Sequence, residues 1–119
     1  MKNFTVEFYE TRKGECPAEE FIEMQEVKMR AKILRMIGLL EEYGNELRMP
    51  YSEYLSDGIC QIRAQVGTDI TRVLYFFYNG KKIIVTNGFV KKTQETPPME
   101  IELAKKYRLD YLSRQEGTQ

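Results

Sequence analysis

The sequence predicts an α+β fold: a small antiparallel sheet, two N-terminal helices packed on one of its faces, and a C-terminal helix. Two observations lead to this class. Apolar residues recur at helical spacing in residues 17–43 and again after residue 97, whereas residues 4–9 and 59–89 show the alternation and the β-branched and aromatic content of strands. The order of these elements favours helices layered on an antiparallel meander.

The chain is expected to form one domain over residues 1–119. It has 42% hydrophobic and 30% charged residues, a balance typical of soluble globular proteins. A domain of this size buries roughly two thirds of the surface that its unfolded chain exposes, which suffices for a core of its own. There is no run of about 18 apolar residues and no secretion signal, so we expect a cytoplasmic protein without membrane insertion.

The N-terminal half is predicted to hold one strand and two helices. Residues 4–9 alternate apolar and polar side chains, which fits a strand with one buried face. Cys16 and Pro17, followed by two glutamates, are typical of a helix start. The apolar stripe of this helix is expected to consist of Phe21, Ile22, Met24 and Val27. A second helix is expected over residues 30–43, ending at Gly44. Its stripe would consist of Ile33, Leu34, Met36, Ile37, Leu40 and Tyr43.

The C-terminal half is predicted to hold three strands and one helix. Residues 45–58 have the proline, serine and Asp57-Gly58 pattern of a loop. Strands follow at residues 59–66, 70–78 and 81–89, and Asn79-Gly80 joins the last two through a type I′ turn. Thr96 and Pro97 would start the last helix. Because both early helices are expected on one sheet face, the opposite face is predicted to stay open.

Several classes of chemistry are excluded by residue usage. The chain contains no histidine, which removes serine–histidine triads and imidazole metal ligands. No P-loop, dinucleotide fingerprint, nucleophile elbow or paired-cysteine motif occurs, so no metal and no cofactor are expected. Cys16 and Cys60 are expected to be two reduced thiols rather than a disulfide, as is usual in the cytosol.

The charge is unevenly distributed although the formal net charge is zero. Residues 1–57 carry 8 Lys and Arg against 12 Asp and Glu, and residues 95–119 carry 4 against 5. Residues 58–94 carry 6 basic residues against one acidic residue. Because local clustering of cations sets the field that a phosphate backbone meets, the central strands are predicted to bind nucleic acid.

Strand alternation predicts where these cations gather. Arg63 would lie on the open face between Gln61 and Gln65, with Arg72 and Phe89 alongside on neighbouring strands. Lys91 and Lys92 follow the last strand directly. Any single surface Lys or Arg is most often only solvated, but the grouping favours a phosphate-binding patch. The aromatic run at residues 75–78 is more often core than a stacking platform for bases.

The second half of the chain also resembles a known family, the RelE/ParE/HigB toxin superfamily, in its phage-derived HigB-like branch. The resemblance is carried by these segments: Met49-Pro50-Tyr51-Ser52, Leu55, Asp57-Gly58, Gln61-Ile62-Arg63, Arg72-Val73-Leu74-Tyr75-Phe76-Phe77, and Gly88-Phe89-Val90-Lys91-Lys92-Thr93-Gln94-Glu95-Thr96-Pro97. The first strand and the early helices agree with this family only in pattern.

The resemblance implies the toxin component of a type II toxin–antitoxin system, with a RelE-like fold. It implies metal-independent cleavage of mRNA on the ribosome. It also implies a cognate antitoxin of helix-turn-helix type, and the toxin would contact DNA only indirectly, through this antitoxin. By position, Arg63, Arg72, Lys91 and Lys92 are the implied catalytic residues. Gln61, Gln65, Asn87 and Phe89 are the predicted RNA-binding residues.

Two alternatives stay open from the sequence. Some members of the superfamily inhibit DNA gyrase instead of cutting RNA, so a protein-binding toxin is the first alternative. An inert phage-derived binding domain is the second, because related sequences often have histidine where this chain has Asn87. The general acid of an RNA cleavage reaction is therefore not assigned.

Overall fold

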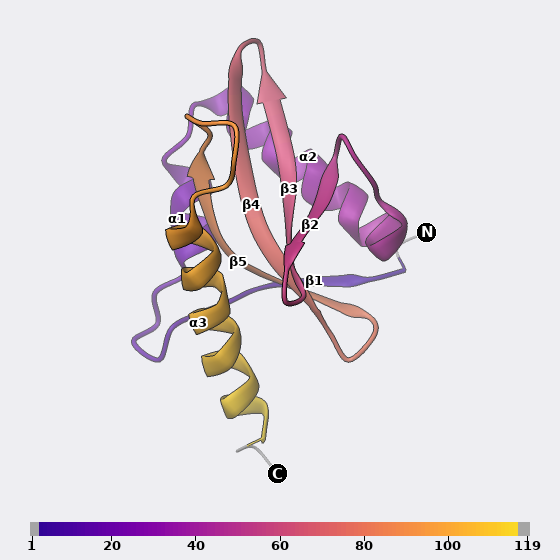
Figure 1. Ribbon diagram of the computed structural model, residues 1–119, viewed down its shortest axis with the longest axis vertical. Helices are drawn as coiled ribbons and strands as arrows, with labels where there is room; N and C mark the ends of the chain where they lie inside the picture. The colour runs from indigo at the N-terminus through magenta and orange to yellow at the C-terminus, as the bar shows by residue number, and fades with distance from the viewer. Residues whose placement is uncertain (1–2, 117–119) are drawn as a thin grey trace.

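The computed structural model describes residues 3–116, and within them it confirms the α+β class (Figure 1). A five-stranded sheet lies between two N-terminal helices and a long C-terminal helix. The elements in chain order are β1 (Thr5–Phe8), α1 (Pro17–Glu23), α2 (Val27–Tyr43), the 3-10 turn η1 (Gly44–Glu46), β2 (Ser52–Ser56), β3 (Ile59–Val66), β4 (Asp69–Tyr78), β5 (Lys82–Val90) and α3 (Pro98–Glu116).

The sheet is mixed rather than antiparallel throughout. Its strand order is β1-β5-β4-β3-β2, and the meander from β2 to β5 is antiparallel. β1 pairs in parallel with β5, in a register that sets Thr5 opposite Lys82 and Phe8 opposite Val85. The predicted antiparallel setting of the N-terminal strand is therefore wrong. The chain crosses over the sheet through α1 and α2 after β1, and such a crossover allows a parallel pair.

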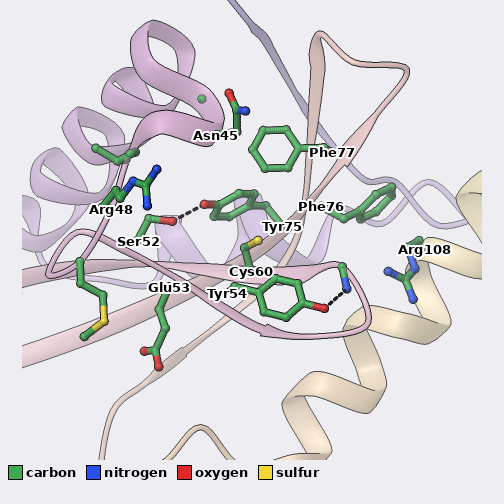
Figure 2. Close-up of a pocket in the computed structure, with 14 residues that line it drawn as sticks. Asn45, Arg48, Ser52, Glu53, Tyr54, Cys60, Tyr75, Phe76, Phe77 and Arg108 are labelled. Carbon is green, nitrogen blue, oxygen red and sulfur yellow. Dashed lines mark hydrogen bonds between the residues drawn. The ribbon is translucent and has the colours of Figure 1, made fainter.

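Strand β2 lies in a segment that was predicted to be a loop. Ser52–Ser56 pairs with β3 as an edge strand, with a bulge between Tyr54 and Ser56. Polar residues dominate β2 and give no alternation, so backbone hydrogen bonds to β3 rather than burial of a face hold it in place. Ser52 is the exception, since its buried hydroxyl shares a hydrogen bond with the Tyr75 hydroxyl (Figure 2).

Each face of the sheet has its own hydrophobic core. On the first face α1 and α2 pack over β3, β4 and β5, and the buried residues are Ala18, Ile22, Met29, Ile33, Met36, Ile37, Leu40, Ile62, Ala64, Val73, Tyr75, Ile83 and Val85. On the second face α3 packs over the same strands, and the buried residues are Tyr9, Ile59, Leu74, Phe76, Ile84, Phe89, Ala104 and Tyr111. The prediction of a wholly open second face is therefore wrong, because α3 covers much of it.

The predicted helix stripes are correct only in part. Ile22, Ile33 and Leu40 are buried, whereas Met24 and Val27 are 82% and 72% exposed. The reason is a break between the helices: α1 ends at residue 23 and α2 begins at residue 27, so one helical phase does not run through both. Leu34 and Tyr43, predicted in the stripe of the second helix, are also exposed.

Two smaller predictions can be compared with the structure. Cys16 and Cys60 are free thiols, as predicted. In the part of the chain that the structure describes, no helix is both long and apolar enough to cross a membrane.

Gly44 ends α2 as predicted, and it does so for a steric reason. Its φ is 52° with ψ at −122°, a conformation that side chains disfavour. A Cβ atom at Gly44 would overlap the ring of Phe4. The chain can turn there because glycine lets the N-terminal segment lie directly against the helix end.

We expect Gly44→Ala to lower the free energy of unfolding by about 1–3 kcal/mol through backbone strain, with a further loss because Phe4 must move. Gly38→Ala is the matched control. Its Cβ would meet nothing within 4 Å, and alanine should raise helix stability by about 0.5–1 kcal/mol. Urea denaturation measures both, and equal effects of the two substitutions would contradict the steric account.

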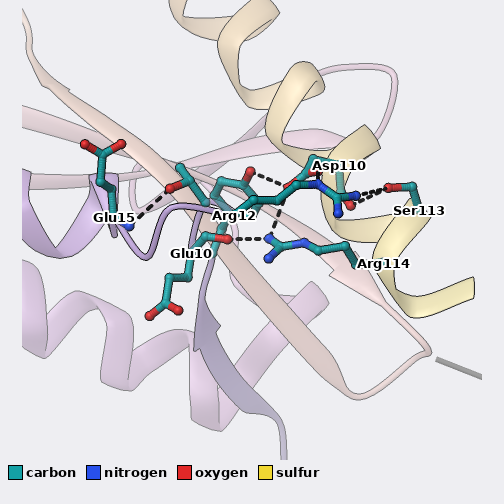
Figure 3. A network of polar contacts seen from close by, with 8 residues as sticks. Glu10, Arg12, Glu15, Asp110, Ser113 and Arg114 are labelled. Carbon is teal, nitrogen blue, oxygen red and sulfur yellow. Dashed lines mark hydrogen bonds and ion pairs between the residues drawn. The ribbon is translucent and has the colours of Figure 1, made fainter. Parts of the chain in front are cut away.

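A polar network fastens α3 to the segment that follows β1 (Figure 3). The Tyr9 hydroxyl donates to Asp110 at 2.7 Å, and Arg12 Nε donates to the other carboxylate oxygen at 2.8 Å. Arg114 forms an ion pair with Asp110 at 3.1 Å and donates to the Glu10 carbonyl. The hydrogen bond from Tyr9, followed by Arg12 and Arg114, lowers the pKa of Asp110. Burial and the Asp110 contact raise the pKa of Tyr9 to about 12.

This network predicts an acid-dependent loss of stability. Because the native state lowers the pKa of Asp110, its contribution is present above the ordinary value of 3.8 and is lost as the pH falls through the lower native value. The stability difference between the wild type and Asp110→Asn should therefore shrink between about pH 5 and about pH 2. Asp69→Asn, at an exposed carboxylate at the start of β4, is the control. A difference independent of pH would contradict the assignment.

Candidate functional site

The two predicted arginines lie in one row across neighbouring strands of the sheet. Arg63 of β3 lies opposite Arg72 of β4, and Arg72 lies opposite Phe89 of β5. Directly paired residues share a sheet face, so these three side chains lie on the face that α3 partly covers. The covered part is nearer the other end of these strands, where Ile59 and Phe76 are buried. Arg63 and Arg72 therefore border the part of this face that α3 leaves open, as strand alternation predicted.

A bulge in β5 makes this row possible. The β4–β5 register shifts between Leu74 and Tyr75, which leaves Thr86 without a partner on β4. Thr86 is buried, and its hydroxyl donates to the Leu74 carbonyl at 3.2 Å. Val85 belongs to the core under α2, so uninterrupted alternation would place Phe89 on that same side. The extra residue places Phe89 beside Arg72 instead.

Arg72 is the most constrained of the cations. Its side chain is 13% exposed, and Nη1 lies 3.8 Å from the Glu53 carboxylate. Its Nε is buried and finds no hydrogen-bond partner within residues 3–116. Burial lowers the pKa of the Arg72 guanidinium, the charge of Arg63 lowers it further, and Glu53 opposes both. The sheet thus holds a guanidinium whose hydrogen-bonding capacity is only partly used, which suits a group that binds an external anion.

Glu53 is held in place by a short chain of hydrogen bonds. Gln61 Nε2 donates to Glu53 Oε1 at 3.1 Å, and the Thr96 hydroxyl donates to Gln61 Oε1 at 2.6 Å. Gln61 is 2% exposed, so a buried amide holds the Glu53 carboxylate in position through this hydrogen bond. Sequence analysis missed Glu53 because it placed residues 45–58 in a loop. Pairing of β2 with β3 sets Glu53 opposite Gln61, and no periodicity in the sequence marks that pairing.

The remaining predicted residues on β3 and after β5 lie around this pair. Arg63 donates to the Gln65 side chain, and Gln65 donates in turn to the Gly67 carbonyl at 2.8 Å. The backbone N–H of Lys91 donates to the Ile70 carbonyl at 2.8 Å and extends the β4–β5 ladder by one step. Continued alternation sets Lys91 on the same face as Phe89, and Lys92 is exposed beside it.

Two predicted residues lie under α3 instead of on the open surface. Asn87 is 3% exposed, and its amide donates to the side chain and the carbonyl of Glu100 at 3.1 and 3.3 Å. Phe89 is 9% exposed and packs in the core under α3. The RNA-binding roles given to Asn87 and Phe89 stay predictions, and their visible contribution is to position the start of α3.

Arg63 borders two cavities, and Arg72 borders the first of them. The first has a volume of about 140 Å³ and is lined by Glu53, Gln61, Arg63 and Arg72, with residues 49–52 as its wall. The second has a volume of about 380 Å³ and is lined by Lys32, Met36, Pro50, Tyr51, Arg63, Gln65 and Gly67. Among residues 3–116, no group of three or more cysteine or acidic side chains is arranged to hold a metal ion. The site therefore presents guanidinium groups, an amide and one carboxylate to its ligand.

A comparison with protein families gives a match. A family model described as Phage derived protein Gp49-like (DUF891) matches residues 20–108. The chain belongs to this Gp49-like family. The Gp49-like match includes Glu53, the arginine pair and both lysines, so the whole candidate site lies inside the shared region. A search of curated proteins finds no match.

The environment of Arg72 predicts that its guanidinium does not stabilise the fold and that the charge serves the function of the site. We expect Arg72→Met to keep or raise the melting temperature, because methionine fills similar space without a buried, partly unpaired guanidinium beside Arg63. Thermal denaturation followed by circular dichroism measures this. Val73→Ala, one residue along β4 and 1% exposed, is the control and should lower stability by about 1–3 kcal/mol. A comparable loss in Arg72→Met would show that the guanidinium is structural.

Proposed function

We propose that this Gp49-like protein is the toxin of a type II toxin–antitoxin system and cleaves mRNA on the ribosome without a metal ion. The observation that carries the proposal is the Arg63–Arg72 pair beside Glu53 on the uncovered part of the sheet. Membership in a phage-derived family and the toxin-like segments in the second half of the chain support the same conclusion.

The chemistry asks for stabilisation of negative charge at phosphorus. Attack of a ribose 2′-hydroxyl on the adjacent phosphate forms a pentacoordinate phosphorane, and departure of the 5′-oxygen leaves a cyclic phosphate. Arg72 and Arg63 supply guanidinium donors for the charge that develops on the equatorial oxygens. Because Arg72 is mostly buried, the lower local dielectric strengthens its interaction with that charge.

Proton transfer in the proposed reaction is assigned to two kinds of groups. Glu53 is 46% exposed and held by Gln61, so its carboxylate would take the proton from the 2′-hydroxyl. Lys91 follows Phe89 on the Arg72 face, and its ammonium would protonate the departing 5′-oxygen, with Lys92 binding a neighbouring phosphate. Arg72 then has two roles, since it also orients the carboxylate 3.8 Å away.

The proposal includes its partners. A cognate antitoxin, of the helix-turn-helix type, would keep the toxin inactive and bring it to DNA, while mRNA and the ribosome are its targets in the cytoplasm. The basic strands between residues 58 and 94 supply the cationic surface that such RNA contact needs.

Induction of the wild-type chain should create new codon-linked 5′ ends in cellular transcripts, detected by primer extension. Arg72→Met and Glu53→Gln should each lower cleavage about 100-fold or more, because the first removes transition-state stabilisation and the second removes the base. Lys91→Ala should act in the same direction. Arg35→Ala, an exposed cation on α2, is the control and should cleave like the wild type.

Growth arrest without new transcript ends would contradict the nuclease. A DNA supercoiling assay with purified protein then tests the alternative of gyrase inhibition. Gyrase inhibition does not require the arginine pair, so the arginine substitutions need not change the result of that assay. Relief of the arrest by a neighbouring open reading frame tests the antitoxin half of the proposal separately.

A further inference from the structure

A large cavity lies beyond the end of α2, around the β2 edge of the sheet, and α3 contributes Arg108 to its lining (Figure 2). Its volume is about 930 Å³, at the upper end of the range for small-molecule sites. The cavity exists because α2 stops at Tyr43 and does not extend over the start of β3 and the end of β4. Its lining consists of Gly44, Asn45, Leu47, Arg48, Met49, Ser52, Glu53, Tyr54, Gly58, Cys60, Tyr75, Phe76, Phe77 and Arg108.

Aromatic rings dominate this cavity. Tyr75 and Phe77 meet edge to face with ring centroids 5.7 Å apart. Tyr54 of β2 is 63% exposed, yet its ring is fixed because its hydroxyl accepts a hydrogen bond from the Gly58 N–H at 3.1 Å. An exposed ring anchored at its far end can stack on a planar group without losing rotational freedom on binding. The cavity therefore offers a preformed stacking surface.

The polar groups of the cavity sit at its rim and its floor. Asn45 and Arg48 are exposed side chains on the loop between α2 and β2, where they offer an amide and a cation. Ser52 and Tyr75 share a hydrogen bond, and burial raises the pKa of both the Tyr75 hydroxyl and the Cys60 thiol. Tyr75 and Cys60 are thus uncharged near neutral pH, and the charged residues of the lining are Arg48, Glu53 and Arg108.

We propose that this cavity binds the base of a nucleotide, stacked on Tyr54, with its phosphate at Arg48. The ring of Tyr54 suits a base, the amide of Asn45 suits the base edge, and the cation of Arg48 suits the phosphate. Arg108 is a second cation of the lining, and Glu53 is its one carboxylate. Two sources supply this chemistry: a free mononucleotide, or a base of the RNA that the arginine pair holds.

The second source follows from the position of β2 and rests on the proposed function. Met49, Ser52 and Glu53 line both this cavity and the 140 Å³ cavity at Arg63 and Arg72. An RNA strand whose phosphate lies at the arginines can therefore pass across β2 and place a neighbouring base against Tyr54. In that case the cavity contributes to the sequence preference of cleavage.

NMR titration with the four ribonucleoside 5′-monophosphates tests the proposal. The Gly58 amide is the reporter, because it donates to the Tyr54 hydroxyl and should shift when a base stacks on that ring. Tyr54→Leu should weaken binding at least about fivefold, since loss of base stacking typically has that effect, while Tyr54→Phe keeps the ring and should retain most of the affinity. Tyr43→Leu, an exposed tyrosine of α2 outside the cavity lining, is the matched control.

The outcomes separate the two sources. Binding that Tyr54→Leu weakens, together with an altered set of cleaved codons in that variant, supports an mRNA base in the cavity. The same loss with unaltered cleavage supports a free nucleotide. The same loss with no cleavage by the wild type also supports a free nucleotide, and in that case the pocket stays assigned although the nuclease proposal fails. No saturable shift with any nucleotide, or equal effects of Tyr54→Leu and Tyr43→Leu, would overturn the proposal.

Discussion

Strand β4 connects the two cores to the candidate site, because alternate residues of this one strand face opposite sides of the sheet. Val73 and Tyr75 are buried under α2, whereas Leu74 and Phe76 are buried under α3. With both faces occupied, the register of β4 against its neighbours is strongly specified. Arg72 continues the α3-facing series just beyond the covered part. The four apolar residues that follow it in β4 therefore fix the position of Arg72, and Arg72 itself contributes nothing to the register of the strand.

The site includes a buried polar atom that no hydrogen bond satisfies. Among the described residues, the buried side-chain atoms without a hydrogen-bond partner are Arg30 Nε, Arg72 Nε, Asn87 Oδ1 and the Tyr111 hydroxyl, and Arg72 Nε is the one that belongs to the arginine pair. Buried polar groups in native proteins are nearly always bonded, and exceptions gather where function has competed with stability. By contrast, Gln61 uses both ends of its amide, toward Glu53 and Thr96. One side of the site is fully bonded and rigid, and the other keeps capacity for a ligand.

How much was predictable depends on whether a feature is local. The strands at residues 59–66 and 70–78 and the pairing of Arg63 with Arg72 follow from alternation and a short turn, so the sequence predicts them correctly. Glu53 could not be placed because β2 is held by backbone pairing at an edge, where polar side chains leave no pattern. The burial of Asn87 and Phe89 depends on the docking of α3, and the parallel setting of β1 depends on a distant strand. Neither the docking of α3 nor the parallel pairing of β1 gives a recognisable pattern in the sequence of the residues concerned.

Thr86 shows how one extra residue in a strand determines which face of the sheet the following side chains occupy. The inserted residue reverses the orientation of the residues that follow it in β5, so Phe89 lies opposite Arg72 although Val85 points into the opposite core. Continued alternation sets Lys91, just after the strand, on the same face as Phe89. Removing one residue there would leave the composition and charge of the strand nearly unchanged while turning Phe89 and Lys91 toward the face that carries α1. In such a family, gaps of a single residue in β5 would separate members with an assembled cationic row from members without one, even where every arginine and lysine is retained.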